Sequence, residues 1–194
     1  MPLFGVLALQ GDWHAHRRVL HGLGVESRPV RTASDVAGIH GLVLPGGEST
    51  AMLRLMEPED LTRRIGDRIA TGMAVLATCA GVILLAENVA PKQACLGALS
   101  VDVVRNAYGR QVHSSVEEVR VGPDLGPPPS MEGVFIRAPV ISRVGAAVEV
   151  LGRRGSDPVI VRQGRLLGVT FHPELTADRR IHELFVRMVE GRNG

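Results

Sequence analysis

Residues 73–83 are Met73-Ala74-Val75-Leu76-Ala77-Thr78-Cys79-Ala80-Gly81-Val82-Ile83. The apolar run over 73–78 predicts a buried strand, and the apolar residues after Cys79 predict a short helix over 80–87. Because the strand meets the helix within two residues, the chain must turn sharply at Cys79, and the small residues beside it leave room for such a turn. This strand–turn–helix unit is the centre of the predicted fold.

The sequence before this unit alternates in the same way. Strands are predicted over 3–9, 26–31 and 41–44, and helices over 12–23, 48–56 and 60–71. Asp12 is expected to cap the first helix and Gly24 to end it. Such alternation predicts an α/β fold with a doubly wound, mostly parallel sheet flanked by helices. Ligands of these sheets lie beyond the carboxyl ends of the strands.

The second half of the chain has a different pattern. Short β-like runs are predicted over 96–105, 116–121, 134–137, 144–151, 158–162 and 166–171, followed by a last helix over 178–189. Pro127-Pro128-Pro129 is expected in a loop or at a sheet edge. The sequence shows no repeat, low-complexity segment or linker. We therefore expect residues 1–194 to form a single domain with an antiparallel excursion in its second half.

Composition disfavours several classes of protein. Lys and Arg number 22 against 20 Asp and Glu, the charges are scattered and only 3% of residues are aromatic, which disfavours a nucleic-acid surface. Two cysteines, Cys79 and Cys95, do not make a disulfide framework. The N-terminus lacks a basic signal-peptide head, and no apolar run is long enough to span a bilayer. We expect a cytoplasmic chain without membrane or nucleic-acid partners.

Cys79 is the candidate nucleophile. A thiol held at the first turn of a helix is favoured as thiolate by the helix dipole and the free amide groups, and the N–H of Ala80 is a candidate oxyanion donor. The alternative is that Cys79 is a small buried core residue, as free cysteines usually are. Cys95 has no such turn beside it and is interpreted as structural.

Gly168-Val169-Thr170-Phe171-His172-Pro173-Glu174 supplies the candidate base and orienting acid. Residues two apart on an extended segment point to the same side, so the carboxylate of Glu174 is expected to orient the imidazole of His172. Nucleophile, base and orienting acid together form a catalytic triad. The alternative is a capped strand end with an incidental carboxylate.

Leu44-Pro45-Gly46-Gly47-Glu48-Ser49-Thr50 follows a predicted strand. Two glycines permit close approach of the backbone, and the N–H of Gly47 is a candidate second oxyanion donor. Glu48 and Ser49 stand where a helix begins, so their alternative role is ordinary helix capping.

These motifs, in this order, resemble the class I (triad) glutamine amidotransferases, and most closely the glutaminase subunits of pyridoxal 5'-phosphate synthases. The resemblance spans essentially the whole chain. Four segments carry it: Ala8-Leu9-Gln10-Gly11, Pro45-Gly46-Gly47-Glu48-Ser49-Thr50, Arg105-Asn106-Ala107-Tyr108-Gly109-Arg110-Gln111 and Phe135-Ile136-Arg137-Ala138-Pro139. The sequence departs from relatives at Ala77, Ala15 and Ser114-Ser115-Val116, and none of these positions belongs to the triad.

The resemblance implies a glutaminase that hydrolyses L-glutamine without a cofactor or metal. It implies Cys79 as nucleophile, with His172 and Glu174 as the relay. Glutamine binding is implied for a set of residues in three segments: Gly47, Glu48, Ser49, Arg105, Ile136 and Arg137. The resemblance also implies that the partner is a (β/α)8-barrel synthase subunit, which receives the ammonia. The resemblance further implies that the free glutaminase is poorly active until the partner docks, and we expect Gln10 to lie near the place where such a switch would act.

Three alternatives stay open at the level of sequence. They are a glutaminase of another synthase such as imidazole glycerol phosphate synthase, a free-standing γ-glutamyl hydrolase or cysteine peptidase, and a non-catalytic regulatory subunit. The Arg105-to-Gln111 segment argues against the first, and an intact triad argues against the last. His14 and His16 are not expected to bind a metal, because residues two apart on a helix point to different faces; we expect a solvated surface or a partner contact there.

Overall fold

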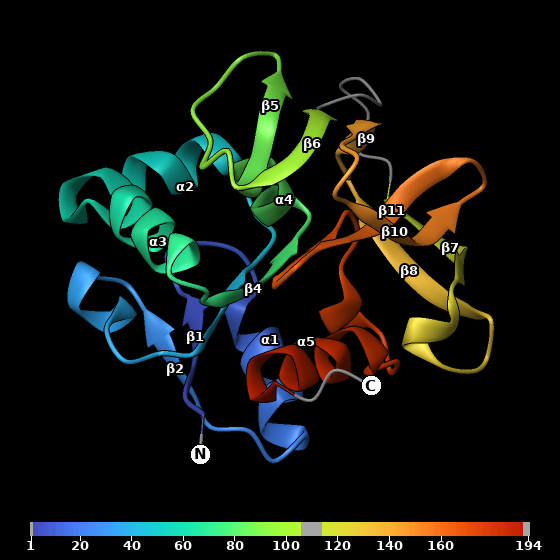
Figure 1. Cartoon of the computed structure of the whole chain (residues 1–194), viewed down its shortest axis with the longest axis horizontal. Helices are drawn as coiled ribbons and strands as arrows, with labels where there is room; N and C mark the ends of the chain where they lie inside the picture. The colour runs from blue at the N-terminus through green and yellow to red at the C-terminus, as the bar shows by residue number, and fades with distance from the viewer. Residues whose placement is uncertain (1, 106–113, 192–194) are drawn as a thin grey trace.

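A computed structural model describes residues 2–105 and 114–191 of the 194-residue chain. The main sheet has nine strands in the order β2-β1-β3-β4-β12-β11-β10-β7-β8, and a smaller sheet has the order β5-β6-β9. Figure 1 shows the main sheet crossing the molecule, with the small sheet at the top of the view. This is an α/β fold with a large mixed sheet, as the sequence predicts.

The main sheet changes from parallel to antiparallel pairing at one strand. The parallel part contains β2 (Ser27–Val30), β1 (Phe4–Leu7), β3 (Gly41–Leu44), β4 (Ala74–Thr78) and β12 (Leu166–Val169). The antiparallel part contains β11 (Asp157–Gln163), β10 (Glu149–Arg154), β7 (Ser114–Val121) and β8 (Ser130–Ile136). The small sheet contains β5 (Ala86–Ala90), β6 (Leu99–Val104) and β9 (Val140–Val144). The predicted antiparallel excursion is thereby confirmed.

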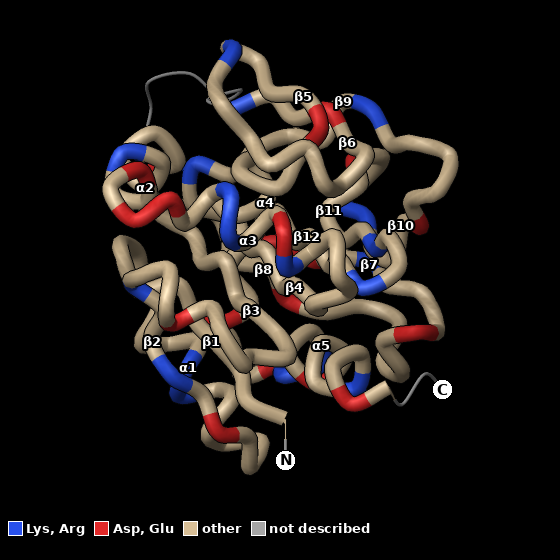
Figure 2. The backbone as a smooth tube through the Cα atoms, turned by 60° about the vertical axis from the view of Figure 1, so that its left-hand side comes forward, with Lys and Arg blue, Asp and Glu red and all other residues tan. Residues whose placement is uncertain are grey.

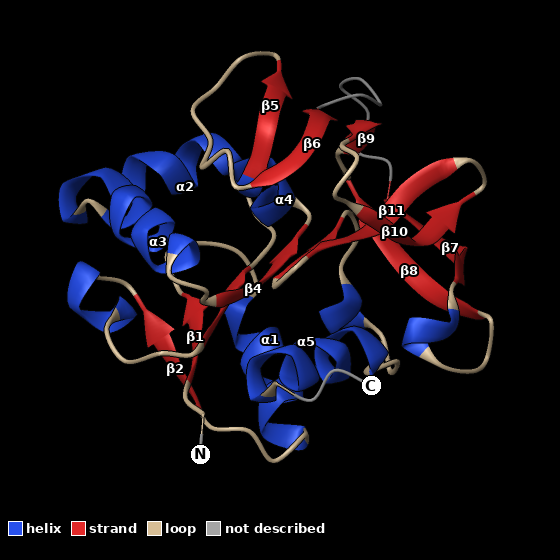
Figure 3. Ribbon diagram, viewed as in Figure 1, coloured by secondary structure: helices blue, strands red, loops and turns tan. Residues whose placement is uncertain are grey.

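Helices cover both faces of the parallel part, as Figure 3 shows. They are α1 (Trp13–Gly22), α2 (Ser49–Met56), α3 (Leu61–Ala70), α4 (Ala80–Leu85) and α5 (Arg180–Glu190), with short 3-10 helices at Ala33–Val36, Glu57–Glu59, Pro123–Leu125 and Pro173–Leu175. Asp12 caps α1, because its side chain accepts the N–H of Ala15 at 3.0 Å. Gly24 follows the end of α1 with a φ of +74°.

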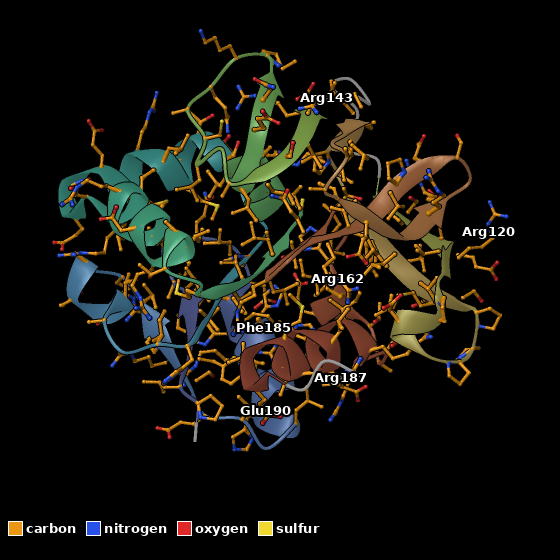
Figure 4. All side chains as sticks on the ribbon, in the orientation of Figure 1. Arg120, Arg143, Arg162, Phe185, Arg187 and Glu190 are labelled. Carbon is orange, nitrogen blue, oxygen red and sulfur yellow. The ribbon has the colours of Figure 1, made fainter. Side chains whose placement is uncertain are left out.

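Strand side chains alternate between two hydrophobic cores, one on each face of the sheet. In β4, Ala74 and Leu76 belong to the core under α1 and α5, whereas Val75 and Ala77 belong to the core under α2, α3 and α4. On the first face the ring of Phe185 in α5 packs edge-on against Phe4, with centroids 5.5 Å apart. Figure 4 shows Phe185 on the side of α5 that faces the sheet. Strands β1, β3, β4 and β12 are therefore buried on both sides, which explains their apolar sequences, whereas the edge strand β2 is only partly buried.

Two predicted elements differ from the structure. The predicted strand over 144–151 is wrong, since β9 ends at Val144 and β10 begins at Glu149 in a different sheet. Between them the N–H of Gly145 bonds the carbonyl of Ser100 at 2.8 Å, and Val148 closes a turn onto Gly145. The predicted helix over 80–87 ends earlier, at Leu85, and strand β5 begins at Ala86.

Acidic and basic residues are interleaved along the chain, as Figure 2 shows. An example is Arg143 on β9, labelled at the edge of the small sheet in Figure 4, which pairs with Glu87 and Asp102 at 2.7 Å each. None of the described helices is both long and apolar enough to cross a membrane.

Candidate active site

Cys79 stands at the sharp turn between β4 and α4. Its φ of 47° and ψ of −108° are unusual for a residue with a side chain, and such strain is found where a structure holds a side chain for function. The N–H of Cys79 donates to the carbonyl of Val169 in β12 at 2.8 Å. Gly81 lets α4 approach β3, because a Cβ there would lie 2.1 Å from the carbonyl oxygen of Leu44. Neighbouring strands thus fix the turn predicted from the sequence.

His172 and Glu174 form a hydrogen-bonded pair after β12. Nδ1 of His172 lies 2.8 Å from Oε1 of Glu174, and the glutamate is buried. The segment is not extended as the sequence analysis assumed, since Pro173–Leu175 forms a 3-10 turn and the N–H of Leu175 bonds the carbonyl of His172. The predicted proximity holds, but a turn rather than strand alternation produces it.

His172 also contacts the cysteine. Burial lowers the pKa of His172, but hydrogen bonds and opposite charges at Cys79 and Glu174 raise it to about 10. The imidazole is therefore protonated at neutral pH when Cys79 is a thiolate. Sγ of Cys79 further lies 3.7 Å from the carbonyl oxygen of Ile136, which accepts its hydrogen bond in the thiol form. A cysteine, a histidine and a carboxylate are thereby arranged in series.

The glycine loop closes directly over this pair. A Cβ built on Gly46 would lie 2.4 Å from Cε1 of His172 and 3.3 Å from Cβ of Cys79. Gly11 packs on the other side of the loop, where a Cβ would lie 1.9 Å from the carbonyl oxygen of Gly46. Gly47 has a φ of +148° that favours glycine. The two glycines permit the close approach that the sequence analysis expected.

Glu48 caps the first turn of α2. Its carboxylate accepts the N–H groups of Thr50 at 3.2 Å and Ala51 at 2.7 Å. Partial burial raises the pKa of Glu48, but these hydrogen bonds lower it by a larger amount, so the net shift is downward. The N–H of Glu48 donates to Oε1 of Gln10 at 2.6 Å. The capping role that the sequence left open is therefore present, alongside a direct link from the loop to Gln10.

A polar network connects the loop to Arg105 at the end of β6. Nη1 of Arg105 donates to Oγ1 of Thr50 at 2.9 Å and to Oε1 of Gln93, and Oγ of Ser49 donates to the same Gln93 oxygen at 3.0 Å. Gln93 was missed by the sequence analysis, because it lies in an irregular segment without a motif. It fixes two of the residues expected to bind substrate.

A cleft of about 300 Å³ brings the predicted residues together. Ten of its lining residues were predicted to have a catalytic, oxyanion-binding or substrate-binding role. They are Cys79, His172, Glu174, Ala80, Gly47, Glu48, Ser49, Arg105, Ile136 and Arg137. Gln10 reaches the cleft only through its bond to Glu48. Asp12, Ile83 and Leu175 also line it and were not predicted to do so. Arg137 is exposed and has a φ of 45°, a strain that no sequence pattern signalled.

His16 differs from the sequence expectation. We expected a solvated surface or a partner contact, but His16 is fully buried, whereas His14 is exposed. Nδ1 of His16 lies 3.0 Å from Nε2 of His182, which is also fully buried. The two side chains do point to different faces of α1, as predicted, and the face of His16 is turned towards the site. Residues 106–111 of the segment that carries the family resemblance lie outside the described residues.

Comparison with known proteins identifies the class of protein. A solved structure described as a glutamine amidotransferase is 44% identical in sequence and superposes with a TM-score of 0.89, covering 96% of this chain and 98% of that one. A solved GMP synthase component from Thermoplasma acidophilum shares the fold at a TM-score of 0.73 and 21% identity, covering 98% of this chain and 95% of that one. The chain has the fold of a glutamine amidotransferase.

The family is also defined. The model of the SNO glutamine amidotransferase family matches residues 6–191. The chain belongs to that family. Two similar relatives are each named pyridoxal 5'-phosphate synthase subunit PdxT. The one from Kosmotoga olearia is 46% identical over 190 residues (97% of this chain, 98% of the relative), and the one from Thermus thermophilus is 47% identical over 187 residues (95% and 96%).

Proposed function

We propose that this chain is the glutaminase subunit of a pyridoxal 5'-phosphate synthase, which hydrolyses L-glutamine and supplies ammonia for vitamin B6 biosynthesis. The observation that carries the proposal is the hydrogen-bonded His172–Glu174 pair beside Cys79 in the cleft. Full-length similarity to relatives that carry the name of this subunit supports it.

The proposed reaction begins with the thiolate of Cys79. Its sulfur bonds to the side-chain carbonyl carbon of glutamine, and the carbonyl oxygen becomes an oxyanion held by the N–H groups of Gly47 and Ala80. His172 gives its proton to the amide nitrogen, the C–N bond breaks, and ammonia leaves behind a glutamyl thioester. Glu174 holds the imidazole in the orientation needed for this transfer.

Hydrolysis of the thioester completes the cycle. Water transfers a proton to His172 as its oxygen bonds to the thioester carbon, and the C–S bond then breaks to release glutamate and the Cys79 thiolate. The substrate is held by Gly47, Glu48, Ser49, Arg105, Ile136 and Arg137, which line the cleft. Its α-carboxylate suits one of the two arginines, because guanidinium and carboxylate pair with matched geometry.

The proposed partner is a (β/α)8-barrel synthase subunit that consumes the ammonia. Docking beside Gln10 would act on the oxyanion loop, because the Gln10 side chain is bonded to the N–H of Glu48 within that loop. The proposal includes low activity of the free chain and a cytoplasmic location, where the free thiols of Cys79 and Cys95 stay reduced.

Release of glutamate and ammonia from glutamine tests the proposal, measured with and without an added barrel subunit. We expect the barrel subunit to stimulate turnover strongly, and we expect this stimulation to be lost in Cys79→Ala. Equal turnover with and without that subunit would reject the partner and favour another synthase or a free-standing hydrolase. Absence of turnover in both conditions would reject the enzyme itself and favour a regulatory subunit.

A further inference from the structure

A buried pair of histidines lies directly behind the candidate triad. Nε2 of His16 in α1 is 3.3 Å from Oε2 of Glu174 and 3.2 Å from Oγ1 of Thr78, the residue before Cys79. Its Nδ1 is 3.0 Å from Nε2 of His182 in α5. One ring thus contacts both the segment that supplies the carboxylate and the strand that supplies the nucleophile.

The carboxylate of Glu174 is bonded unequally. Its Oε1 accepts from His172 at 2.8 Å, whereas its buried Oε2 has no well-aligned hydrogen bond from the described residues. Nε2 of His16 lies 3.3 Å from Oε2 but is not aligned for a hydrogen bond with it. An ionised carboxylate only accepts, so a proton on this nitrogen attracts Oε2, and a lone pair there would repel it.

Both histidines behind the triad are neutral at neutral pH. Burial lowers the pKa of His16 well below its usual value, and the adjacent His182 and His172 lower it further. Burial also lowers the pKa of His182, to about 4. A neutral imidazole donates from one nitrogen and accepts at the other. If Nε2 of His16 carries the proton, then its Nδ1 accepts from His182, and the unpartnered, buried Nδ1 of His182 holds only a lone pair.

We propose that His16 is a positioning residue for the triad, which holds Oε2 of Glu174 with its Nε2–H group while His182 fixes that tautomer. The inference rests on the proposed function. A neutral donor at this place orients the carboxylate without cancelling its charge, so Glu174 still stabilises the imidazolium of His172. The groups that face His16 are Glu174 and His172 beside the 3-10 turn, His182 on α5 and Thr78 on β4.

The tautomer of His16 can be measured in the unaltered protein. Histidine labelled with ¹⁵N gives ring-nitrogen shifts that distinguish a protonated from an unprotonated Nε2, and His182→Leu assigns the coupled pair. We expect Nε2–H on His16 at neutral pH. A proton on Nδ1 of His16 would overturn the proposal, irrespective of the alkylation and turnover of any variant.

Variants test the consequence for the nucleophile in a Cys95→Ser background, where iodoacetamide reports on Cys79 alone. His16→Leu removes the donor, whereas His16→Gln keeps an amide N–H within reach of Glu174. We expect the pH midpoint of Cys79 alkylation to rise in His16→Leu, with alkylation about tenfold slower below the midpoint, which corresponds to one pKa unit. The glutamine variant is expected to restore most of the loss.

Turnover with the barrel subunit separates positioning from packing. In His16→Leu we expect kcat to fall and KM for glutamine to stay unchanged. We also expect the pH range over which the enzyme is active to narrow at both its acid and its alkaline end. A purely structural role would scale the amount of active protein and leave the alkylation midpoint unmoved, and that result would refute the proposal. If the unaltered chain does not hydrolyse glutamine, then the proposed function fails, while the tautomer and the alkylation midpoint remain readable.

Discussion

Gly46 and His172 are in direct backbone-to-ring contact, since a Cβ on Gly46 would lie 2.4 Å from Cε1 of the imidazole. The loop after β3 therefore packs directly against the ring of the candidate base. The same Cβ would lie 3.1 Å from Nδ1, the ring nitrogen that bonds Glu174.

Gly46→Ala is expected to displace His172 and lower glutamine turnover about 100-fold, since small misplacements of catalytic groups have effects of this size. The measurement is glutamate release at saturating barrel subunit. Gly66→Ala in α3 is the matched control, because its Cβ would meet nothing closer than 3.9 Å. That control should keep full turnover and raise the free energy of unfolding by about 0.5–1 kcal/mol. Full activity of Gly46→Ala would show that the contact is unimportant.

Glu174→Gln is expected to move the alkaline limb of the pH profile to lower pH. The negative charge of Glu174 helps to hold the pKa of His172 at about 10, and the neutral amide removes that support. We expect kcat to fall about 100-fold, a typical effect for a proton-transfer group. The pH dependence of kcat/KM measures the shift, with Glu118→Gln on exposed β7 as control. An unchanged alkaline limb would contradict this assignment.

The same pKa predicts the pH dependence of stability. A folded-state pKa of about 10, above the usual 6.5, means that the folded protein binds the His172 proton more tightly than the unfolded chain does. The stability from the charged imidazole is complete below pH 6.5 and is lost as the pH rises through about 10. Denaturant unfolding between these values is expected to show a decrease that His172→Gln lacks. A parallel decrease in that variant would assign the effect to other groups.

Arg105→Lys is expected to raise the KM for glutamine about tenfold, the equivalent of one charge-assisted hydrogen bond. Lysine cannot reproduce the guanidinium contacts with Thr50 and Gln93 that fix the side chain in the cleft. Steady-state kinetics with varied glutamine provide the measurement. Arg143→Lys, on the small sheet among its own acidic partners, is the control and should leave KM unchanged. An unaltered KM in Arg105→Lys would remove Arg105 from the binding site.

Phe185→Ala is expected to lower the free energy of unfolding by about 3–5 kcal/mol, because it empties a fully buried site against Phe4. Urea unfolding followed by circular dichroism gives the value. Leu55→Ala, at a position that is 48% exposed, should change it by less than about 0.5 kcal/mol. Equal effects of the two substitutions would contradict the packing described for α5.

Much of the site was predictable because its residues follow strands. Parallel strands end at a common edge, so Gly46 after β3 and Cys79 after β4 were expected to lie close together. The sequence analysis placed residues 166–171 among the β-like runs of the second half, and the structure shows that β12 pairs in parallel with β4 and brings His172 to the same edge. The strand predicted over 144–151 failed for the opposite reason. Its apolar residues belong to two sheets, and the turn at Gly145 is fixed by Ser100, which is distant in sequence.

The sequence by itself determined the alternation of buried strands and helices, the sharp turn at Cys79 and the spacing of His172 and Glu174. These features depend on side-chain size, apolar period and backbone freedom, which are properties of neighbouring residues. Only the tertiary structure decided that His16 is buried behind Glu174 and that Gln93 holds Arg105. Both relationships join residues from separate elements, and no local pattern encodes which polar side chain a folded core will enclose.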